Sequence, residues 1–558
     1  MLEEIKKYRY DIIVLGMGAA GLRAAIEAKR LGANTAIIAS CNDSPNQTGA
    51  TVTSIYSYCA PLHRRDTPEQ FFKDTVEKGR YANNPDLVKR LADSAVNRLI
   101  EMDSFGIRWD KEADGSFEIN WLPGHTYPRA VHYDHKTGKE IARGLYKKVK
   151  NENLDVLPYR FAVDFITEGN KIKGIIVINL IEGRPEIFET GAVILATGGA
   201  SQLWEVNSNP SGLTGDGIAM ALRAGAQVVD LEYQQFYPSC VVYPTIAKNV
   251  HYPYFSKGIL INSKGERFLE KYGLEEGKDV RDVLAIAIYK EIRQGNGTIN
   301  KGVLVDFGET PQEVLRQIQD DPIIRYLHDL GVNPMGDDIE IAPSAHFTMG
   351  GVRIDKNSKT SLEGLFACGE VCGGCHGANR LAGNALTETQ VFGVIAGHNA
   401  ALYANKVNNY AVCRQQIDTL LDEQFQHDIP LDIESVRMKT KHLKGIMEDN
   451  VKVVRNKTSL VKAKSELDKI LEQTFGLKIP FAGIPLNYKR VEALKLKNMI
   501  LVAQTMAGSA LLREESRGAH FREDFPDARD EWKDKSITAI LQNDEIKYAV
   551  IKRQKLCY

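Results

Sequence analysis

Residues 10–31 read YDIIVLGMGAAGLRAAIEAKRL, and this stretch decides which fold the sequence predicts. Apolar residues at 10–15, typical of a buried β-strand, lead directly into a glycine motif and then into a helical pattern. The motif consists of Gly16, Gly18 and Gly21. In this strand–turn–helix context it is typical of dinucleotide binding, because the glycines let the backbone approach a pyrophosphate at a helix N-terminus. It predicts an α/β fold with a doubly wound, Rossmann-like domain.

A second glycine-rich segment lies about 350 residues further along the chain, where residues 366–391 read FACGEVCGGCHGANRLAGNALTETQV. Doubly wound FAD enzymes close the pyrophosphate site from one end of the chain and the flavin site from the other. The separation of the two segments therefore favours FAD over NAD as the cofactor.

The length and charge of the chain narrow its class. With 558 residues it is too long for one hydrophobic core and should form about two to four domains. Its 71 Lys and Arg against 72 Asp and Glu give a formal net charge of −1, so no global field would attract nucleic acid or an acidic membrane. We therefore expect a small-molecule partner and no nucleic acid.

Targeting and anchoring signals are not expected either. The first residues, MLEEIKKYRYDII, are acidic where a signal peptide is basic, and no apolar run approaches the roughly 20 residues of a membrane helix. The 8 cysteines are scattered, unlike those of a disulfide scaffold. We expect a soluble, cytoplasmic protein without a direct membrane span.

The order of patterns along the chain predicts three domains and a tail. Apolar strands alternate with amphipathic helices up to about residue 235, then the pattern loosens, and charged helix-forming sequence follows after residue 410. The predicted boundaries are 1–235 and 344–405 for the FAD-binding domain, 236–343 for an inserted α+β capping domain, 406–520 for a C-terminal helical domain and 521–558 for a C-terminal tail.

Three further segments carry a family resemblance. Residues 376–381 (HGANRL), 345–351 (AHFTMGG) and 515–524 (ESRGAHFRED) resemble signature segments of the flavoprotein subunits of fumarate reductase and succinate dehydrogenase, and of the related L-aspartate oxidases. The resemblance extends from about residue 11 to 526. It implies an FAD-dependent oxidoreductase that acts, in the reductive direction, on a carbon–carbon bond next to a carboxylate.

A flavin subunit of this kind needs electrons from outside the chain. The sequence has no second nucleotide fingerprint and no array of cluster ligands, so we expect a separate iron–sulfur protein as partner, while the oligomeric state stays open. A self-sufficient amino-acid oxidase of the L-aspartate oxidase type is one alternative, and a non-catalytic flavin-binding assembly protein is another. Three cationic groups at one site, Arg281, His346 and Arg380, argue against the second.

The resemblance also assigns cofactor contacts. The usual fingerprint has an acidic residue near the end of the second strand, but residues 39–42 read ASCN, so Ser40 is the candidate for the adenosine ribose. Asp216 resembles a nucleotide contact, and Glu370 resembles the carboxylate that accepts hydrogen bonds from the ribityl hydroxyls. The expected cofactor-binding residues are Gly16, Gly18, Ala19, Ala20, Gly21, Ser40, Thr48, Gly49, Ala50, Thr197, Gly198, Asp216, Gly369, Glu370, Arg380, Gly383, Asn384, Ala385 and Leu386.

Respiratory members of the family carry a histidine that bonds covalently to the flavin. Here the matching stretch, residues 44–50, reads SPNQTGA, with Asn46 or Gln47 in place of that histidine. An amide nitrogen cannot replace an imidazole as the nucleophile, so we expect FAD to be bound non-covalently. Loss of the link usually lowers the flavin potential, which favours substrate reduction or an oxidase.

Reduction of an activated C=C bond requires a hydride, a group that polarises the carboxylate, and a proton for the other carbon. The resemblance offers His346 and Arg380 as the polarising clamp, since a guanidinium matches a carboxylate in bidentate fashion. Arg281 resembles the family's proton donor. Because the pKa of an arginine exceeds 12, it can serve only when it is held against the carbon and reloaded through a relay.

The chain departs from the family at the second carboxylate site. Residues 236–239 read FYPS where the family has Phe-His-Pro-Thr, and residues 251–258 read HYPYFSKG where it has Thr-Glu-Gly and a glycine-rich turn. Aromatic residues make the cap wall more apolar, so a carboxylic acid with a bulkier or non-dicarboxylate tail is expected and fumarate is less favoured. The expected substrate-binding residues are Tyr237, Ser256, Lys257, His346 and Arg380.

Two patterns resemble metal sites. Cys368, Cys372 and Cys375 have the CxxxCxxC spacing of a radical iron–sulfur centre in another fold, but here they lie among glycines that must wrap the flavin. We interpret them as small residues packed against the cofactor, with a thiol that meets substrate as the alternative. His132 and His135 lack a carboxylate or cysteine partner at a fixed offset. We expect no metal.

Overall fold

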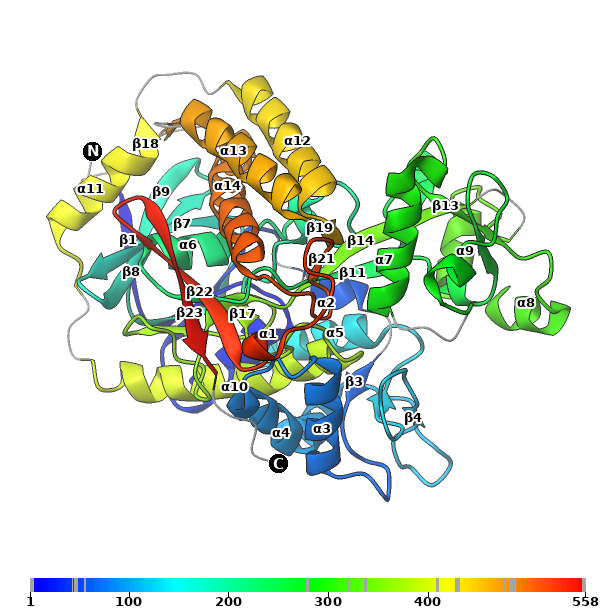
Figure 1. Cartoon of the computed structure of the whole chain (residues 1–558). Helices are drawn as coiled ribbons and strands as arrows, with labels where there is room; N and C mark the ends of the chain where they lie inside the picture. The colour runs from blue at the N-terminus through cyan, green and yellow to red at the C-terminus, as the bar shows by residue number, and fades with distance from the viewer. Residues whose placement is uncertain are drawn as a thin grey trace.

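The computed structural model describes residues 5–42, 44, 49–54, 57–276, 281–319, 321–335, 339–407, 411–426, 432–474, 477–480, 485 and 488–553. A large α/β body carries one unit that projects to the side, which contains residues 281–329 (α7 to α9), and three long helices along its top, between residues 433 and 512 (α12 to α14) (Figure 1).

The body is built on a sheet whose central strands are parallel. β1 (Lys6–Leu15) lies between β2 (Thr35–Ile38) and β9 (Arg184–Leu195), and its last four residues are all buried. Continuous burial is typical of parallel strands that helices cover on both faces. The strand order is β6 (Asp155–Leu157), β2, β1, β9, β8 (Lys171–Asn179) and β7 (Arg160–Glu168), and β16 (Leu365–Ala367) also pairs with β9. The predicted fold class is confirmed.

Two helices bring the glycine-rich segments together. α1 (Ala19–Arg30), which follows the first segment, packs against α10 (Asn384–Ala404), which ends the second. Gly393 and Gly397 of α10 permit this close approach, because a Cβ at either position would crowd the backbone carbonyl of Ala20 or Ala24. The contact explains why segments so distant in sequence form one site.

The segment predicted as a capping domain has a hydrophobic core of its own, which includes Tyr252, Phe268, Ile288 and Val303. A separate core lets such a unit stand over the body as a cap, although the exact domain boundaries stay a prediction. Its antiparallel sheet has the order β11 (Gln234–Tyr243), β14 (Glu340–Thr348), β13 (Val303–Asp306) and β12 (Ile259–Ile261), and its helices are α7 (Arg281–Glu291), α8 (Gln312–Gln319) and α9 (Pro322–Asp329).

The C-terminal part of the chain is integrated with the body. Within the predicted tail, β22 (Lys535–Gln542) and β23 (Glu545–Lys552) form a hairpin, and β22 pairs with β10 (Val228–Val229). The helices above it are α12 (Ile433–Asn450), α13 (Lys457–Thr474) and α14 (Lys489–Leu512).

The signature segment at 515–524 is structural. Arg513, at the end of α14, binds Glu232 (2.5 Å) and Glu515 (3.1 Å), and the side chains of all three are fully buried. Arg522 pairs with Asp524 at 2.7 Å. Buried charges must be paired, and these pairs fasten α14 to the connection between β10 and β11.

The remaining elements connect these units. Among the described helices, none is both long and apolar enough to cross a membrane. The other elements are α2 (Ala50–Thr53), β3 (Tyr58–Cys59), α3 (Pro68–Lys78), α4 (Pro85–Ser104), β4 (Ile119–Asn120), β5 (Ala130–Val131), α5 (Thr137–Asn151), α6 (Asp216–Arg223), β15 (Gly351–Arg353), β17 (Cys372–Gly373), α11 (Arg414–Gln424), β18 (Phe425–Gln426), β19 (Val454–Arg455), β20 (Ile479–Pro480) and β21 (Phe521–Arg522).

Candidate active site

A cavity of about 1380 Å³ lies where the glycine motif, the 366–391 segment and the cap meet. It exceeds the roughly 300–1,000 Å³ of most small-molecule sites, so it has room for a dinucleotide and a substrate together. The predicted site residues that line it are Gly16, Gly18, Ala19, Ala20, Ser40, Gly49, Ala50, Thr197, Gly198, Asp216, Tyr237, Ser256, Arg281, His346, Gly369, Glu370, Arg380, Gly383, Ala385 and Leu386.

Four predicted residues are not among those that line the cavity. Thr48 lies outside the described residues. A Cβ on Gly21 would overlap the carbonyl oxygen of Gly16, so Gly21 packs α1 onto the preceding turn instead of facing the cofactor. Asn384 is buried and its Nδ2 donates to Thr75 Oγ1 (3.1 Å), and Lys257 is exposed.

The N-terminus of α1 is suited to a pyrophosphate. Gly16 has φ of +110° and lies so close to Ala196 that a Cβ would overlap its carbonyl oxygen. Gly18, the residue before α1, has no side chain to cap the helix, while the N–H of Ala19 donates to Thr51 Oγ1 at 3.1 Å. The other N–H groups of the first turn and the positive end of the helix dipole face an anion in the cavity.

Glu370 is a half-buried residue whose carboxyl group lies at the cavity surface. The backbone N–H of Thr348 donates to its Oε1 at 3.0 Å. Burial raises the pKa of Glu370 to about 7, while the Thr348 N–H and Arg380 act in the opposite direction. No cation is paired with it in the described part of the chain, which suits a group that accepts hydrogen bonds from hydroxyls.

The two other proposed nucleotide contacts differ in their surroundings. Asp216, the first residue of α6, already accepts hydrogen bonds from Thr214 Oγ1 (2.7 Å) and Asn498 Nδ2 (2.6 Å), which orient its carboxylate. Ser40 is exposed at the edge of the cavity. Together with the glycine backbone and Glu370, these residues fit an FAD molecule.

Arg380 is a buried cation in the wall of the cavity. Arg380 is 8% exposed, and its guanidinium carbon lies 4.7 Å from the ring centroid of Phe347. Its Nε has no hydrogen-bond partner among the described residues. Burial and the charge of Arg281 lower the pKa of Arg380 to about 10, so it stays protonated at neutral pH. A buried guanidinium without a carboxylate partner is suited to bind an anionic substrate.

Three aromatic side chains form a cluster beside the arginines. Tyr237 lies 4.0 Å from His251 and 5.5 Å from His346 between ring centroids. Ser208 Oγ lies 3.0 Å from Nδ1 of His346, which orients that imidazole. Neither Ser208 nor His251 is among the site residues predicted from the sequence, and the only signal for His251 is its position in the rewritten segment 251–258.

Both imidazoles are neutral at physiological pH. Burial lowers the pKa of His346 well below its ordinary value, and Arg380, His251 and Arg281 lower it further. Burial, followed by the charge of Arg281, lowers the pKa of His251 to about 3. The expectation that His346 is a third cationic group beside Arg281 and Arg380 is therefore wrong, because a charge on its imidazole would be buried next to both guanidinium groups.

Arg281 begins α7 and lines the cavity from the cap side. Its sequence neighbour Asp282 pairs with Arg80 at 3.1 Å and so is engaged outside the site. The guanidinium carbon of Arg281 instead lies over the ring of Tyr237. Arg281 and Arg380 are thus brought to one cavity from the cap and from the FAD segment.

The cysteine pattern is buried in the fold, whereas His132 is half-buried and His135 is exposed. Burial raises the pKa of Cys368, Cys372 and Cys375, so the thiolate that a metal requires is disfavoured. Cys375, His376 and Glu388 offer ligand atoms within 4.8 Å of one another, but His376 Nε2 is already 2.9 Å from Glu388. His132 Nδ1 pairs with Asp110 at 2.8 Å.

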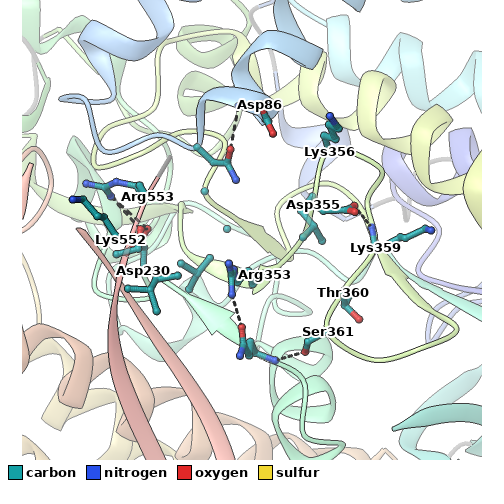
Figure 2. Close-up of a pocket in the computed structure, with 18 residues that line it drawn as sticks. Asp86, Asp230, Arg353, Asp355, Lys356, Lys359, Thr360, Ser361, Lys552 and Arg553 are labelled. Carbon is teal, nitrogen blue, oxygen red and sulfur yellow. Dashed lines mark hydrogen bonds and ion pairs between the residues drawn. The ribbon is translucent and has the colours of Figure 1, made fainter. Parts of the chain in front are cut away.

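A second cavity, of about 520 Å³, is separate from the first (Figure 2). It lies beside β15, β17 and the C-terminal hairpin and contains none of the predicted site residues. Arg353 donates to Gln227 Oε1 (2.6 Å), and Arg553 pairs with Asp230 (3.8 Å). Lys356, Lys359 and Lys552 also line this recess.

Comparison with known proteins adds independent evidence. The FAD binding domain family matches residues 11–386, and the fumarate reductase flavoprotein C-term family matches residues 440–556. The chain is similar to a subunit of fumarate reductase (CoM/CoB) from Methanothermobacter marburgensis, with 36% identity over 538 residues that cover 95% of this chain and 97% of the relative.

Two further proteins are similar to this chain over most of its length. L-aspartate oxidase 2-a of Nicotiana tabacum is 30% identical over 539 residues, which cover 93% of this chain and 82% of the relative. A solved structure of E. coli quinol fumarate reductase superposes with a TM-score of 0.88 at 28% identity, covering 99% of this chain and 98% of that one. The chain therefore belongs to the family of fumarate reductase and succinate dehydrogenase flavoprotein subunits, which has L-aspartate oxidases among its relatives, and it is an FAD-dependent oxidoreductase of the class that acts on CH–CH groups.

Proposed function

We propose that the chain reduces the C=C bond of an α,β-unsaturated carboxylic acid and is the flavin subunit of a larger complex. The observation that carries this proposal is the buried guanidinium of Arg380, which has no carboxylate partner among the described residues and lies in the same cavity as Arg281. Relatives whose names include fumarate reductase support the same chemistry.

The roles follow from the positions of the side chains. When bound, FAD supplies the hydride. Arg380 holds the substrate carboxylate and stabilises the negative charge that develops on it, while neutral His346, oriented by Ser208, donates or accepts a hydrogen bond. Arg281, above the Tyr237 ring, holds the proton that the second carbon receives.

The electron donor is proposed to be a separate iron–sulfur subunit. The fumarate reductase relatives are named as single subunits of their enzymes, which is the composition of a multi-subunit complex. All seven described cysteines are free thiols, and five of them are buried, so they form no exposed cluster site within the described residues. Free thiols also fit the cytoplasmic location that we propose.

An oxidase of the L-aspartate oxidase type is the second candidate, because such enzymes are 30% identical to this chain over most of its length. The two candidates differ in where the electrons go. An oxidase would produce hydrogen peroxide when the isolated chain meets an amino acid, whereas a reductase would take electrons from a reduced dye only when an unsaturated acid is present.

The purified chain with a reduced artificial dye tests the proposal. We expect dye oxidation on addition of α,β-unsaturated acids, and Arg380→Ala should lose substrate-induced changes in the flavin spectrum. Arg353→Ala, which removes an exposed guanidinium at the second cavity, is the matched control and should behave like the wild type. Peroxide production without dye oxidation would overturn the reductase proposal.

A further inference from the structure

Lys78 is a charged group at the active site that the proposed roles leave unused. It is the last residue of α3, is half-buried, and lines the same cavity as Arg281 together with Leu122 and Pro123. No hydrogen bond or ion pair holds its ammonium group within the described residues. Gly124 leaves space for the side chain, since a Cβ there would lie 3.0 Å from Lys78 Cε.

An ion pair fixes Lys78 relative to Arg281. Arg80, two residues after Lys78, pairs with Asp282, the residue that follows Arg281, at 3.1 Å. The Asp282 side chain is 4% exposed and that of Arg80 is 44% exposed. The end of α3, on the body, is thereby joined to the start of α7, on the cap, and the two long basic side chains face one cavity.

We propose that Lys78 returns a proton to Arg281 after each turnover, an inference that rests on the proposed reductive function. Once Arg281 has given a proton to the substrate carbon, its neutral guanidine accepts one from the Lys78 ammonium. The resulting Lys78 amine then takes a proton from solvent, so the net proton comes from water and no oxidant or reductant is required.

The charges around Lys78 favour this direction of transfer. Burial lowers the pKa of Lys78, and the positive charges of Arg80 and Arg281 lower it further. The negative charges of Asp282 and Glu77 raise it and so oppose this effect. A guanidine is a stronger base than an amine, so the proton moves downhill from Lys78 to a neutral Arg281. His251 lies 4.0 Å from Tyr237 between ring centroids, but it is no acid at neutral pH, because burial and the charge of Arg281 hold its imidazole in the neutral form.

The test compares Lys78→Ala with Lys73→Ala, which removes an exposed lysine from the same helix. Both variants should retain the flavin spectrum and substrate-induced changes in it. Lys78→Ala should lower kcat about 10²-fold, the lower end for loss of a proton-transfer group, with little change in KM. Added methylamine should restore part of its activity but should not affect Lys73→Ala.

The pH profile separates proton supply from a merely structural role. The alkaline fall in wild-type kcat should move to higher pH in Lys78→Arg and should disappear in Lys78→Ala. A kcat for Lys78→Ala within twofold of wild type, or a raised KM at unchanged kcat, would overturn the inference while the proposed function stands. A wild-type chain that reduces no unsaturated acid would overturn both.

Discussion

The guanidinium carbon of Arg281 lies 5.0 Å from the ring centroid of Tyr237. A cation over an aromatic face is attracted by about 0.5–2 kcal/mol, so the ring helps to hold Arg281 against the cavity. The same ring stands where dicarboxylate enzymes of the family, by resemblance, place a second anion-binding histidine. We therefore expect Tyr237 both to position the proposed proton donor and to restrict which substrates bind.

Replacement of Arg281 by alanine should abolish turnover while FAD and substrate still bind. Loss of a proton donor typically lowers kcat by about 10²- to 10⁴-fold. Steady-state kinetics with a reduced dye measure this effect, and Arg316→Ala, which removes an exposed arginine from α8 of the cap, is the control. Retention of more than about half of wild-type kcat in Arg281→Ala would make Arg281 a structural residue.

Fumarate should bind this protein more weakly than it binds a dedicated fumarate reductase. Acids with apolar or aromatic tails should compete well with fumarate for the site. Each missing charge-assisted hydrogen bond is worth about 1.5–3 kcal/mol, so one or two of them weaken binding by roughly one to four orders of magnitude. Comparison of KM for fumarate, acrylate-type and aryl-acrylate-type acids measures this.

Tyr237→His is the matched variant for substrate range. It should lower KM for fumarate and raise KM for aryl-acrylate-type acids, because it replaces an apolar face by a hydrogen-bonding ring. A wild-type preference for fumarate with a micromolar KM would contradict the prediction and would indicate that His251, beside Tyr237, supplies the second clamp.

FAD should be released when the protein is denatured. Asn46 and Gln47, which lie outside the described residues, occupy the stretch where a covalently linked histidine would stand. After acid precipitation the yellow flavin should stay in the supernatant. Flavin fluorescence that remains with the polypeptide on a denaturing gel would show a covalent link.

Glu370 should make the FAD-free protein less stable as pH rises. Its pKa is raised by burial to about 7 from an ordinary 4.5, so the folded state holds a proton that the unfolded state releases. Its contribution is fully present below about pH 4.5 and is lost as pH rises through about 7, a difference of about 3 kcal/mol.

Glu370→Gln should remove that pH dependence. Denaturant unfolding between pH 5 and 8 gives the free energy of unfolding of the FAD-free wild type and of the FAD-free variant. Buried histidines such as His251 contribute with the opposite sign, but equally to both proteins, so their contribution cancels in the difference. Equal pH slopes for the two proteins would mean that Glu370 is ionised in the fold.

Much of the fold could be predicted from local pattern. The strand–glycine–helix motif at residues 10–31 specifies a dinucleotide-binding turn. Only glycine fits at position 16, because φ is +110° there and a Cβ would overlap the neighbouring backbone. The later motif that contains Arg380 could be matched to the flavin site for a similar reason. The cap could be predicted because the regular alternation of strands and helices loosens in its segment of the sequence. The structure shows in addition that the cap has its own hydrophobic core.

Other features depended on contacts between distant segments. The 515–524 motif helped to identify the family, yet its charges are used in buried ion pairs with Arg513 and each other. The protonation of His346 follows from burial beside Arg380, His251 and Arg281, residues that come from different segments of the chain. Lys78 and Arg281 line one cavity where the end of α3 meets the start of α7, and the Arg80–Asp282 ion pair joins these two segments.

The sequence by itself determined the cofactor class and the α/β fold, because each depends on residue types at short, fixed spacing, and its family resemblance offered Arg281 and Arg380 as the arginines of the proposed site. Tertiary structure alone decided which side chains share the cavity and which of them carry charge. These properties depend on desolvation and on the distances between charges, which arise only when segments far apart in the chain are packed together.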